Sequence, residues 1–177
     1  MNDSTTIDDA RIDREIDAIL DSAERMFIAT SVDGNSSGAS VFFARDDGDL
    51  LFFTFNPSRK AEQIRVNPNV QAVVWPADQT GIRGLQIEGR CELIKDADCK
   101  ARARAAILQV TTAFEDYMDD EFLNRHGVVG YYRIKPVTIK LVDFYSGTQF
   151  QWREFPHHRL PAWRQLARAA WARTLLW

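Results

Sequence analysis

Apolar and polar residues recur along the chain with two different periods, which divide its first third into one helical and several extended segments. Residues 7–24 place apolar side chains on one stripe between charges, the spacing of an amphipathic helix. The segments 26–31, 39–45 and 50–55 are short and rich in apolar, β-branched and aromatic residues, which is typical of strands. The Asp-Asp-Gly-Asp stretch at 46–49 predicts a tight hairpin between the last two of these strands.

The rest of the chain is also expected to alternate between helices and strands. The expected elements are helices at 56–67 and 96–110, helix and loop at 111–126, and strands at 70–75, 82–94, 128–144 and 149–155. Asn56 is expected to cap the first of these helices, with Pro57 at its first position. The segment 128–144 is expected to form one or two strands, broken near Pro136. Consecutive hairpins imply antiparallel pairing, and roughly six strands of this kind can close a small barrel.

The composition indicates one folded domain. Of 177 residues, 45% are hydrophobic and 27% are charged, and the net charge of −3 does not match nucleic acid. No apolar run approaches the roughly 18 residues that a membrane span needs. The N-terminus is polar and acidic, unlike a secretory signal or a transit peptide. Cys91 and Cys99 are typical of reduced thiols, so a cytoplasmic location is expected.

The two ends of the chain carry opposite charge, with acidic residues in the first 24 positions and arginines in the last 25. This pattern predicts a barrel domain over residues 1–155, with its N-terminal helix at 7–24, and a basic amphipathic tail helix over 156–177. The tail is expected to dock on the chain's own barrel or on a dimer mate. The alternative is contact with an anionic membrane surface or another partner.

The clearest chemical feature lies at 54–60, where a strand ends and a helix begins. A helix N-terminus presents unpaired N–H groups and partial positive charge, which favour a bound phosphate. Arg59 can add a bidentate contact and Lys60 a point charge, while Thr54 and Ser58 can donate hydroxyl groups. The alternative interpretation is a solvated basic patch at an ordinary helix start.

These residues resemble a known family. The stretch Phe52-Phe53-Thr54 through Ser58-Arg59-Lys60-Ala61, followed by Gln63-Ile64 and Asn67-Pro68-Asn69-Val70, is similar to the pyridoxamine 5′-phosphate oxidase superfamily. The strand Ile82-Arg83-Gly84-Leu85-Gln86-Ile87-Glu88-Gly89 resembles a bacterial subgroup of it. The resemblance spans about residues 20–155. It implies an α+β fold, a six-stranded antiparallel split β-barrel with flanking helices, and a homodimer that binds FMN at the subunit interface.

The resemblance also implies roles for residues near the flavin phosphate. Ser58, Arg59 and Lys60 would hold the FMN phosphate, and Thr54 would contribute a hydroxyl group to it. Phe53 would lie beside the ribityl chain.

Further roles concern the flavin ring. The strand that contains Val41 and Phe42 would run along the isoalloxazine ring. Gly84 stands where the oxidases have a flavin-contacting glutamine, and Gln86 would replace that contact from the second subunit. An outward-facing strand glutamine is the alternative for Gln86. Trp152 stands where the family has a tryptophan beside the flavin.

The substrate half of the family's motif is missing. Gly38 and Phe43 stand where the oxidases have an arginine and a lysine, and Pro161 stands where they have a histidine. The resemblance therefore implies an FMN-dependent oxidoreductase with an unknown small-molecule substrate, and oxidation of pyridoxine 5′-phosphate is not expected. An apolar wall of Phe42 and Phe43 would suit a flat, weakly polar substrate such as a quinone.

Other functions remain open at this level. The same fold also binds the deazaflavin F420, and a flavin- or haem-binding protein without turnover is a further alternative. His157 and His158 could assist haem, but three histidines without a neighbouring cysteine or acidic cluster predict no metal site. No Ser–His–Asp triad is evident, and the sequence identifies no catalytic residue.

Overall fold

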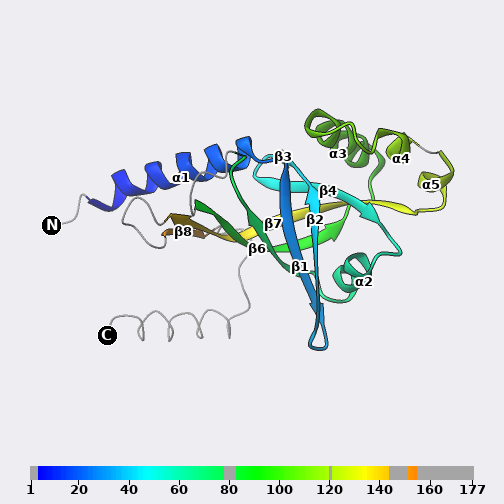
Figure 1. Ribbon diagram of the computed structural model, residues 1–177, viewed down its shortest axis with the longest axis horizontal. Helices are drawn as coiled ribbons and strands as arrows, with labels where there is room; N and C mark the ends of the chain where they lie inside the picture. Colours follow the sequence, from blue (N-terminus) through cyan, green and yellow to red (C-terminus); the bar gives the residue numbers. More distant parts are fainter. Residues whose placement is uncertain (1–3, 78–82, 120, 144–150, 155–177) are drawn as a thin grey trace.

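The computed structural model describes residues 4–77, 83–119, 121–143 and 151–154 (Figure 1). The strands are β1 (Arg25–Val32), β2 (Asn35–Phe42), β3 (Ala44–Asp46), β4 (Asp49–Phe55), β5 (Asn69–Val74), β6 (Arg83–Leu93), β7 (Val129–Asp143) and β8 (Gln151–Glu154). The helices are α1 (Ser4–Ser22), α2 (Arg59–Val66), α3 (Ala97–Val110), α4 (Glu115–Asp119) and α5 (Glu121–Arg125). The tail helix expected over 156–177, with His157, His158 and Pro161, lies outside the described residues.

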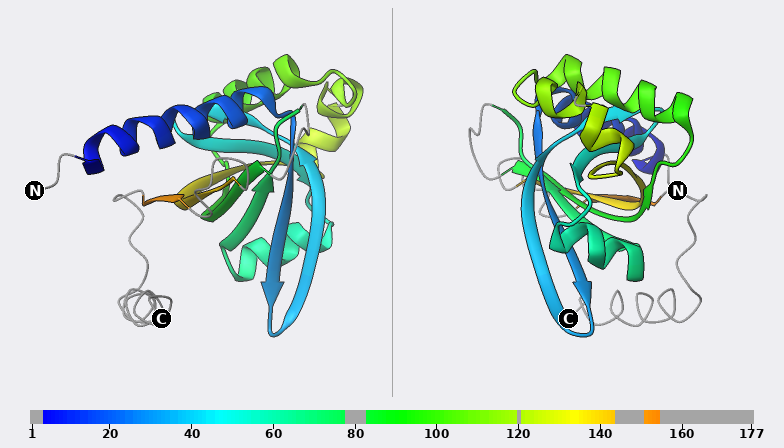
Figure 2. Two further views of the ribbon diagram at one scale, coloured as in Figure 1. Left: turned by 60° about the vertical axis from the view of Figure 1, so that its left-hand side comes forward. Right: turned by 90° about the vertical axis from the view of Figure 1, so that its right-hand side faces the viewer.

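All strands belong to one antiparallel sheet in the order β2-β1-β5-β6-β7-β4-β3, with β8 added to β7. The α+β antiparallel barrel is confirmed, with eight strands in place of the six expected. One reason for the difference is that the strand expected at 39–45 is divided at Phe43 into β2 and β3. These two strands form the opposite edges of the sheet, so the chain crosses from one edge to the other at a single residue. The sheet is correspondingly curled (Figure 2).

Two tight turns set the register of the hairpins. Asp33 and Gly34 join β1 to β2 with φ values of 49° and 78°, and Asp47 and Gly48 join β3 to β4 with 49° and 85°. Positive φ at both central residues gives the turn whose twist matches that of paired strands. The hairpin predicted at 46–49 is therefore confirmed, and the β1–β2 hairpin projects from the body of the protein (Figure 1).

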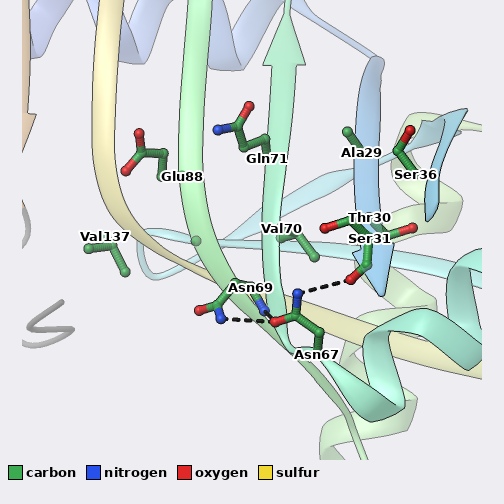
Figure 3. Close-up of a pocket in the computed structure, with 11 residues that line it drawn as sticks. Ala29, Thr30, Ser31, Ser36, Asn67, Asn69, Val70, Gln71, Glu88 and Val137 are labelled. Atoms are coloured by element: carbon green, nitrogen blue, oxygen red, sulfur yellow. Dashed lines mark hydrogen bonds between the residues drawn. The ribbon is translucent and has the colours of Figure 1, made fainter. Parts of the chain in front are cut away.

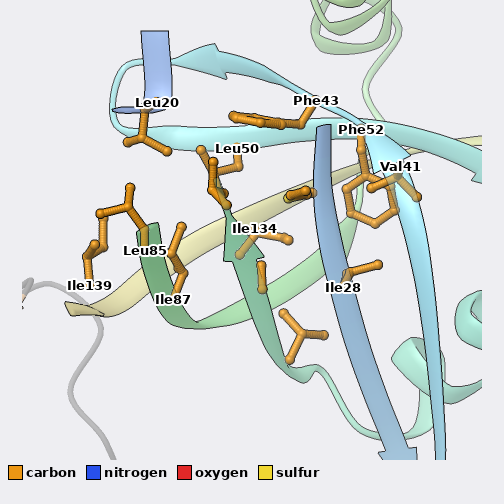
Figure 4. Close-up of a cluster of buried hydrophobic side chains, with 14 of the residues drawn as sticks. Leu20, Ile28, Val41, Phe43, Leu50, Phe52, Leu85, Ile87, Ile134 and Ile139 are labelled. Carbon is orange, nitrogen blue, oxygen red and sulfur yellow. The ribbon is translucent and has the colours of Figure 1, made fainter. Parts of the chain in front are cut away.

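The main core fills the inside of the barrel (Figure 4). Its members come from every long strand and from both α1 and α2, and they include Leu20, Ile28, Phe43, Phe52, Ile64, Leu85 and Ile134. The N-terminal helix expected at 7–24 is α1, and its apolar stripe packs into this core.

Strand β4 is buried on both faces, which explains its unbroken apolar run. Leu50 and Phe52 point into the barrel core, whereas Leu51 and Phe53 belong to a second cluster that includes Ile107 of α3. A strand covered on both faces has no polar alternation. Phe53 is thereby directed to the outside of the barrel, beneath the helices that follow β6.

The break expected at Pro136 does not occur. Strand β7 continues through this position, and Pro136 pairs with Gly89 beside a bulge between Glu88 and Gly89. A β-bulge locally suspends the regular hydrogen bonding of the ladder, so a residue without an N–H is tolerated there. No helix among the described residues has the length and apolar character needed to cross a membrane.

Candidate functional site

The turn from β4 into α2 brings two hydroxyl groups together. Helix α2 begins at Arg59, and Ser58 is its N-cap, with Oγ accepting a hydrogen bond from the Ala61 N–H at 3.4 Å. The Oγ1 atom of Thr54 lies 3.4 Å from the Ser58 Oγ. The cap expected at Asn56 is therefore wrong, because the chain closes a further turn first, with the Ser58 N–H donating to the Phe55 carbonyl at 3.0 Å.

Two cations, Arg59 and Lys60, stand at the start of α2. Arg59 is exposed and Lys60 is half-buried, and no carboxylate in the described part of the chain forms an ion pair with either. Burial lowers the pKa of Lys60 from its ordinary value of 10.5 because an ammonium loses hydration there. A half-buried cation beside two hydroxyl groups at a helix N-terminus is a site that an anion would stabilise.

Thr54 and Lys60 line a pocket of about 220 Å³ on the outside of the barrel. The pocket lies between the ends of β1, β2 and β4, the start of α2, and the segment that follows α3. Its lining residues are Arg25, Ser40, Val41, Phe42, Phe53, Thr54, Phe55, Lys60 and Phe114. Five residues predicted from the sequence to bind a cofactor are among them, namely Val41, Phe42, Phe53, Thr54 and Lys60.

The far end of this pocket is aromatic. The ring of Phe114 meets Phe42 edge-on at 5.9 Å between centroids and Phe53 at 5.4 Å. The guanidinium carbon of Arg25 lies 4.2 Å from the centre of the Phe42 ring. The sequence interpretation missed Arg25 and Phe114. Arg25 is the first residue of β1 and pairs with Phe42, so its place beside the predicted ring-contacting strand could have been inferred. Nothing in the sequence of the 111–126 segment indicated Phe114.

The pocket offers binding groups rather than acid–base groups. Arg25 and Lys60 are the ionisable side chains among its described lining residues, which include no carboxylate, histidine or thiol. A molecule with an anionic group at one end and a flat apolar portion at the other would match both ends. In the described ranges, no group of three potential ligands is arranged to hold a metal ion.

Phe43 does not belong to the pocket wall. Successive strand residues face opposite sides, and Phe43 is only 1% exposed in the barrel core. The apolar wall expected from Phe42 and Phe43 is therefore made by Phe42, Phe53 and Phe114 instead.

Three predicted residues, Ser58, Arg59 and Gln86, are absent from the described lining of this pocket. Gln86 is exposed on β6, where it pairs with Val73. A side chain at Gly84 has no room, because a Cβ atom would lie 2.8 Å from the Val74 carbonyl oxygen and 3.3 Å from the Trp75 ring. Trp152 lies in β8 opposite Lys140, and its side chain falls outside the described residues.

A second pocket, of about 280 Å³, lies between the β1–β2 hairpin, β5 and β6 (Figure 3). Two of its side-chain amides, those of Asn67 and Asn69, are already engaged within the chain. The Asn67 side chain donates to the Ser31 carbonyl at 2.9 Å, and the Asn69 side chain donates to the Asn67 Oδ1 at 2.9 Å. Lysine and arginine are absent from its described lining, so the smaller pocket is the better candidate for an anionic ligand.

A family model identifies the family of this chain, and solved structures agree on its fold. Residues 12–142 match the family model of pyridoxamine 5′-phosphate oxidase. A haem-binding protein from Mycobacterium smegmatis superposes with a TM-score of 0.66 at 16% identity, over 79% of this chain and 56% of that one. This chain thus spans little more than half the length of that protein.

Two further structures have comparable length. General stress protein 26 from Bacillus anthracis has a TM-score of 0.63 at 17% identity, covering 82% of this chain and 99% of that one. An FAD-binding protein from Mesorhizobium loti has a TM-score of 0.57 at 22% identity, covering 71% and 90%. A comparison with curated proteins finds no match.

Proposed function

Because the chain belongs to the pyridoxamine 5′-phosphate oxidase family, we propose that it is an FMN-binding flavoprotein, with the flavin in the pocket between β2, β4 and α2. The observation that carries this proposal is the half-buried Lys60, which has no described ion-pair partner and lines the pocket together with Thr54, whose hydroxyl group lies 3.4 Å from that of Ser58. We call Thr54, Ser58, Arg59 and Lys60 the phosphate site.

The residues present fit the two parts of FMN. The phosphate site supplies positive charge, hydroxyl groups and the N–H groups of Arg59 and Lys60, for which no described residue is an acceptor. Phe42 and Phe53 offer apolar surface for a flat ring, and Val41 also lines the pocket. When bound, FMN would supply hydride or electron transfer, and the protein would orient it and limit its contact with water.

We propose that the protein acts as a homodimer in which the second copy completes the flavin site. A pocket of about 220 Å³ is smaller than the roughly 300–1,000 Å³ usual for ligand sites. The same sheet face carries exposed apolar side chains, with Phe27 42% and Trp75 52% exposed and Val73 opposite Phe27. A second copy packed on this face would bury them and bring its own Gln86 toward the flavin ring.

We further propose an oxidoreductase whose substrate is not pyridoxine 5′-phosphate. The position of the family's substrate lysine holds Phe43, which lies in the barrel core and cannot contact a substrate. FMN-loaded protein supplied with pyridoxine 5′-phosphate in air should form no pyridoxal 5′-phosphate. Turnover near the typical enzyme value of about 10 per second would contradict this.

The cofactor proposal is tested by titration with FMN, riboflavin and FAD, followed by flavin fluorescence, and by the spectrum and mass of whatever copurifies. FMN should bind most tightly, because riboflavin has no phosphate and FAD carries its phosphate within a longer linkage. Equal affinity for FMN and riboflavin would refute the phosphate site. If haem or F420 copurifies in place of FMN, that molecule is the cofactor and the FMN assignment is wrong.

The homodimer is tested by light scattering on the whole chain and on a Phe27→Glu variant. The whole chain should be a dimer, and Phe27→Glu should be a monomer with weakened FMN binding. Val66→Glu is the matched control, because Val66 is also an exposed apolar residue, 66% exposed, but belongs to α2 and not to the sheet. A monomeric wild-type protein that binds FMN tightly would contradict the proposal.

A further inference from the structure

Asn56 connects the end of β4 to the start of β7 through three hydrogen bonds. Its backbone N–H donates to the Val128 carbonyl at 2.7 Å, and its side-chain amide donates to the Gly127 carbonyl. Its Oδ1 atom accepts from the Tyr132 hydroxyl at 2.6 Å. Both ends of the amide are thus engaged with residues more than 70 positions later in the chain.

The surroundings fit this one arrangement. Tyr132 is 4% exposed, and its ring stacks on Phe52 with 5.3 Å between centroids. Burial raises the pKa of Tyr132 to about 12, so its hydroxyl remains a donor at neutral pH. At Gly130, a Cβ atom would lie 2.2 Å from the Asn56 Oδ1, so only glycine leaves space for the amide.

The position of Asn56 in the chain gives these bonds a consequence for ligand binding. It lies between Thr54 and Ser58, where the strand that carries one hydroxyl turns into the helix that carries the other. The cap of α2 and the 3.4 Å approach of these hydroxyl groups therefore depend on how Asn56 is held. Asn56 itself does not line the pocket.

We infer that Asn56 and Tyr132 form a bridge between β4 and β7 that positions the phosphate site for FMN. This inference rests on the proposed FMN binding. Asn56 is a positioning residue, which acts through Thr54, Ser58 and Lys60. Loss of the bridge leaves these groups in the sequence but releases the turn that aligns them, so the phosphate contact is weakened and the flavin ring contact is not.

The test compares FMN with riboflavin in three variants of the full chain. In Asn56→Ala, FMN affinity should fall by about tenfold while riboflavin affinity changes less than about twofold. Tyr132→Phe keeps the stacked ring and removes one bond, so it should shift the ratio in the same direction by a smaller factor. Asn124→Ala is the matched control, because that amide also donates to a backbone carbonyl, Met118 at 2.7 Å, but outside the pocket.

The outcomes separate this inference from the proposed function. A wild-type protein that binds riboflavin and FMN with equal affinity would refute the proposed function. A wild-type preference for FMN that persists in both Asn56→Ala and Tyr132→Phe would refute the bridge alone. Equal losses for both flavins would also refute it, since a purely structural role lowers both. If Asn56→Ala does not fold, the FMN-to-riboflavin ratio of Tyr132→Phe decides.

Discussion

The two ends of the pocket are built in different ways. The phosphate site comes from residues 54–60, one continuous turn of chain whose hydroxyl groups and cations are already neighbours in sequence. The aromatic end combines Phe42 from β2, Phe53 from β4 and Phe114 from the segment after α3. The residues of the first end are thus neighbours in sequence, although hydrogen bonds of Asn56 to β7 hold their turn, whereas the second end is assembled only by the completed fold. Local specification makes a motif recognisable, whereas the aromatic end can change without disturbing it.

The difference extends to the forces involved. The phosphate site would recognise charge through directional hydrogen bonds, so it would contribute little affinity for a ligand that lacks phosphate. The aromatic end would recognise shape and apolar area, which FMN and riboflavin share. Substitutions at the two ends should therefore be distinguishable by the ratio of FMN to riboflavin affinity.

The largest expected effect is the loss of a cation from the phosphate site. Lys60→Met and Arg59→Ala should each weaken FMN binding by about 1.5–3 kcal/mol, the range for a charged hydrogen bond. Riboflavin binding should not change, and the fold should survive because neither cation has a described ion-pair partner. Fluorescence titration and circular dichroism measure the two results. Unchanged FMN affinity would mean that the phosphate binds elsewhere.

The next effect is a dependence on pH. Lys60 is charged below its pKa, which burial lowers, and only the charged form attracts phosphate. FMN affinity should therefore fall as pH rises through that lowered pKa, by no more than the loss caused by Lys60→Met.

Titration across alkaline pH should show this decline in the wild type and not in Lys60→Met. Both proteins should lose affinity below about pH 6, where the phosphate itself gains a proton. An alkaline decline of the same size in both proteins would assign it to another group.

A smaller effect is expected at the aromatic end. Phe114→Ala removes a ring that contacts Phe42 and Phe53, and it should weaken FMN and riboflavin equally, by about 1 kcal/mol. Phe114→Leu is the control that keeps apolar bulk and should recover part of the loss. Isothermal titration with both flavins checks it, and a loss confined to FMN would show that the two ends are not independent.

The smallest effect tests the contribution of the second copy. Gln86→Ala should weaken FMN binding by about 0.5–1 kcal/mol, the value of one neutral hydrogen bond. The effect should vanish in a Phe27→Glu background, where the second copy is absent. An equal loss in both backgrounds would place the Gln86 contact within one chain and break this link between dimer and site.

The sequence was informative where neighbours along the chain make the structure. The tight turn at 46–49, most of the strands and the change from strand to helix over residues 54–60 follow from local patterns. The cap was misplaced at Asn56 because an asparagine before Pro57 looks like a cap unless its partners on β7 are known. Similarly, Pro136 looked like a break because the bulge opposite it lies on another strand.

The sequence also could not show which face of the sheet each apolar side chain occupies. Phe42 and Phe43 are adjacent and chemically identical, and only the path of the chain decides that one lines the pocket and the other fills the core. Phe114 comes from a segment without a clear pattern, and its contacts depend on how α3 packs on β4. Both assignments need long-range contacts that no single stretch of sequence records.

The one-residue connection at Phe43 also constrains how this protein can change through evolution. An insertion or deletion of one residue between β2 and β3 would exchange the faces of the residues on one side of it, moving Phe42 inward or Phe43 outward. The same event would disturb both edges of the barrel, since the two strands lie at opposite ends of the sheet order. Length variation should therefore be found in the exposed turn at Asp33 and Gly34, whereas the chain at 42–44 should change only by substitution.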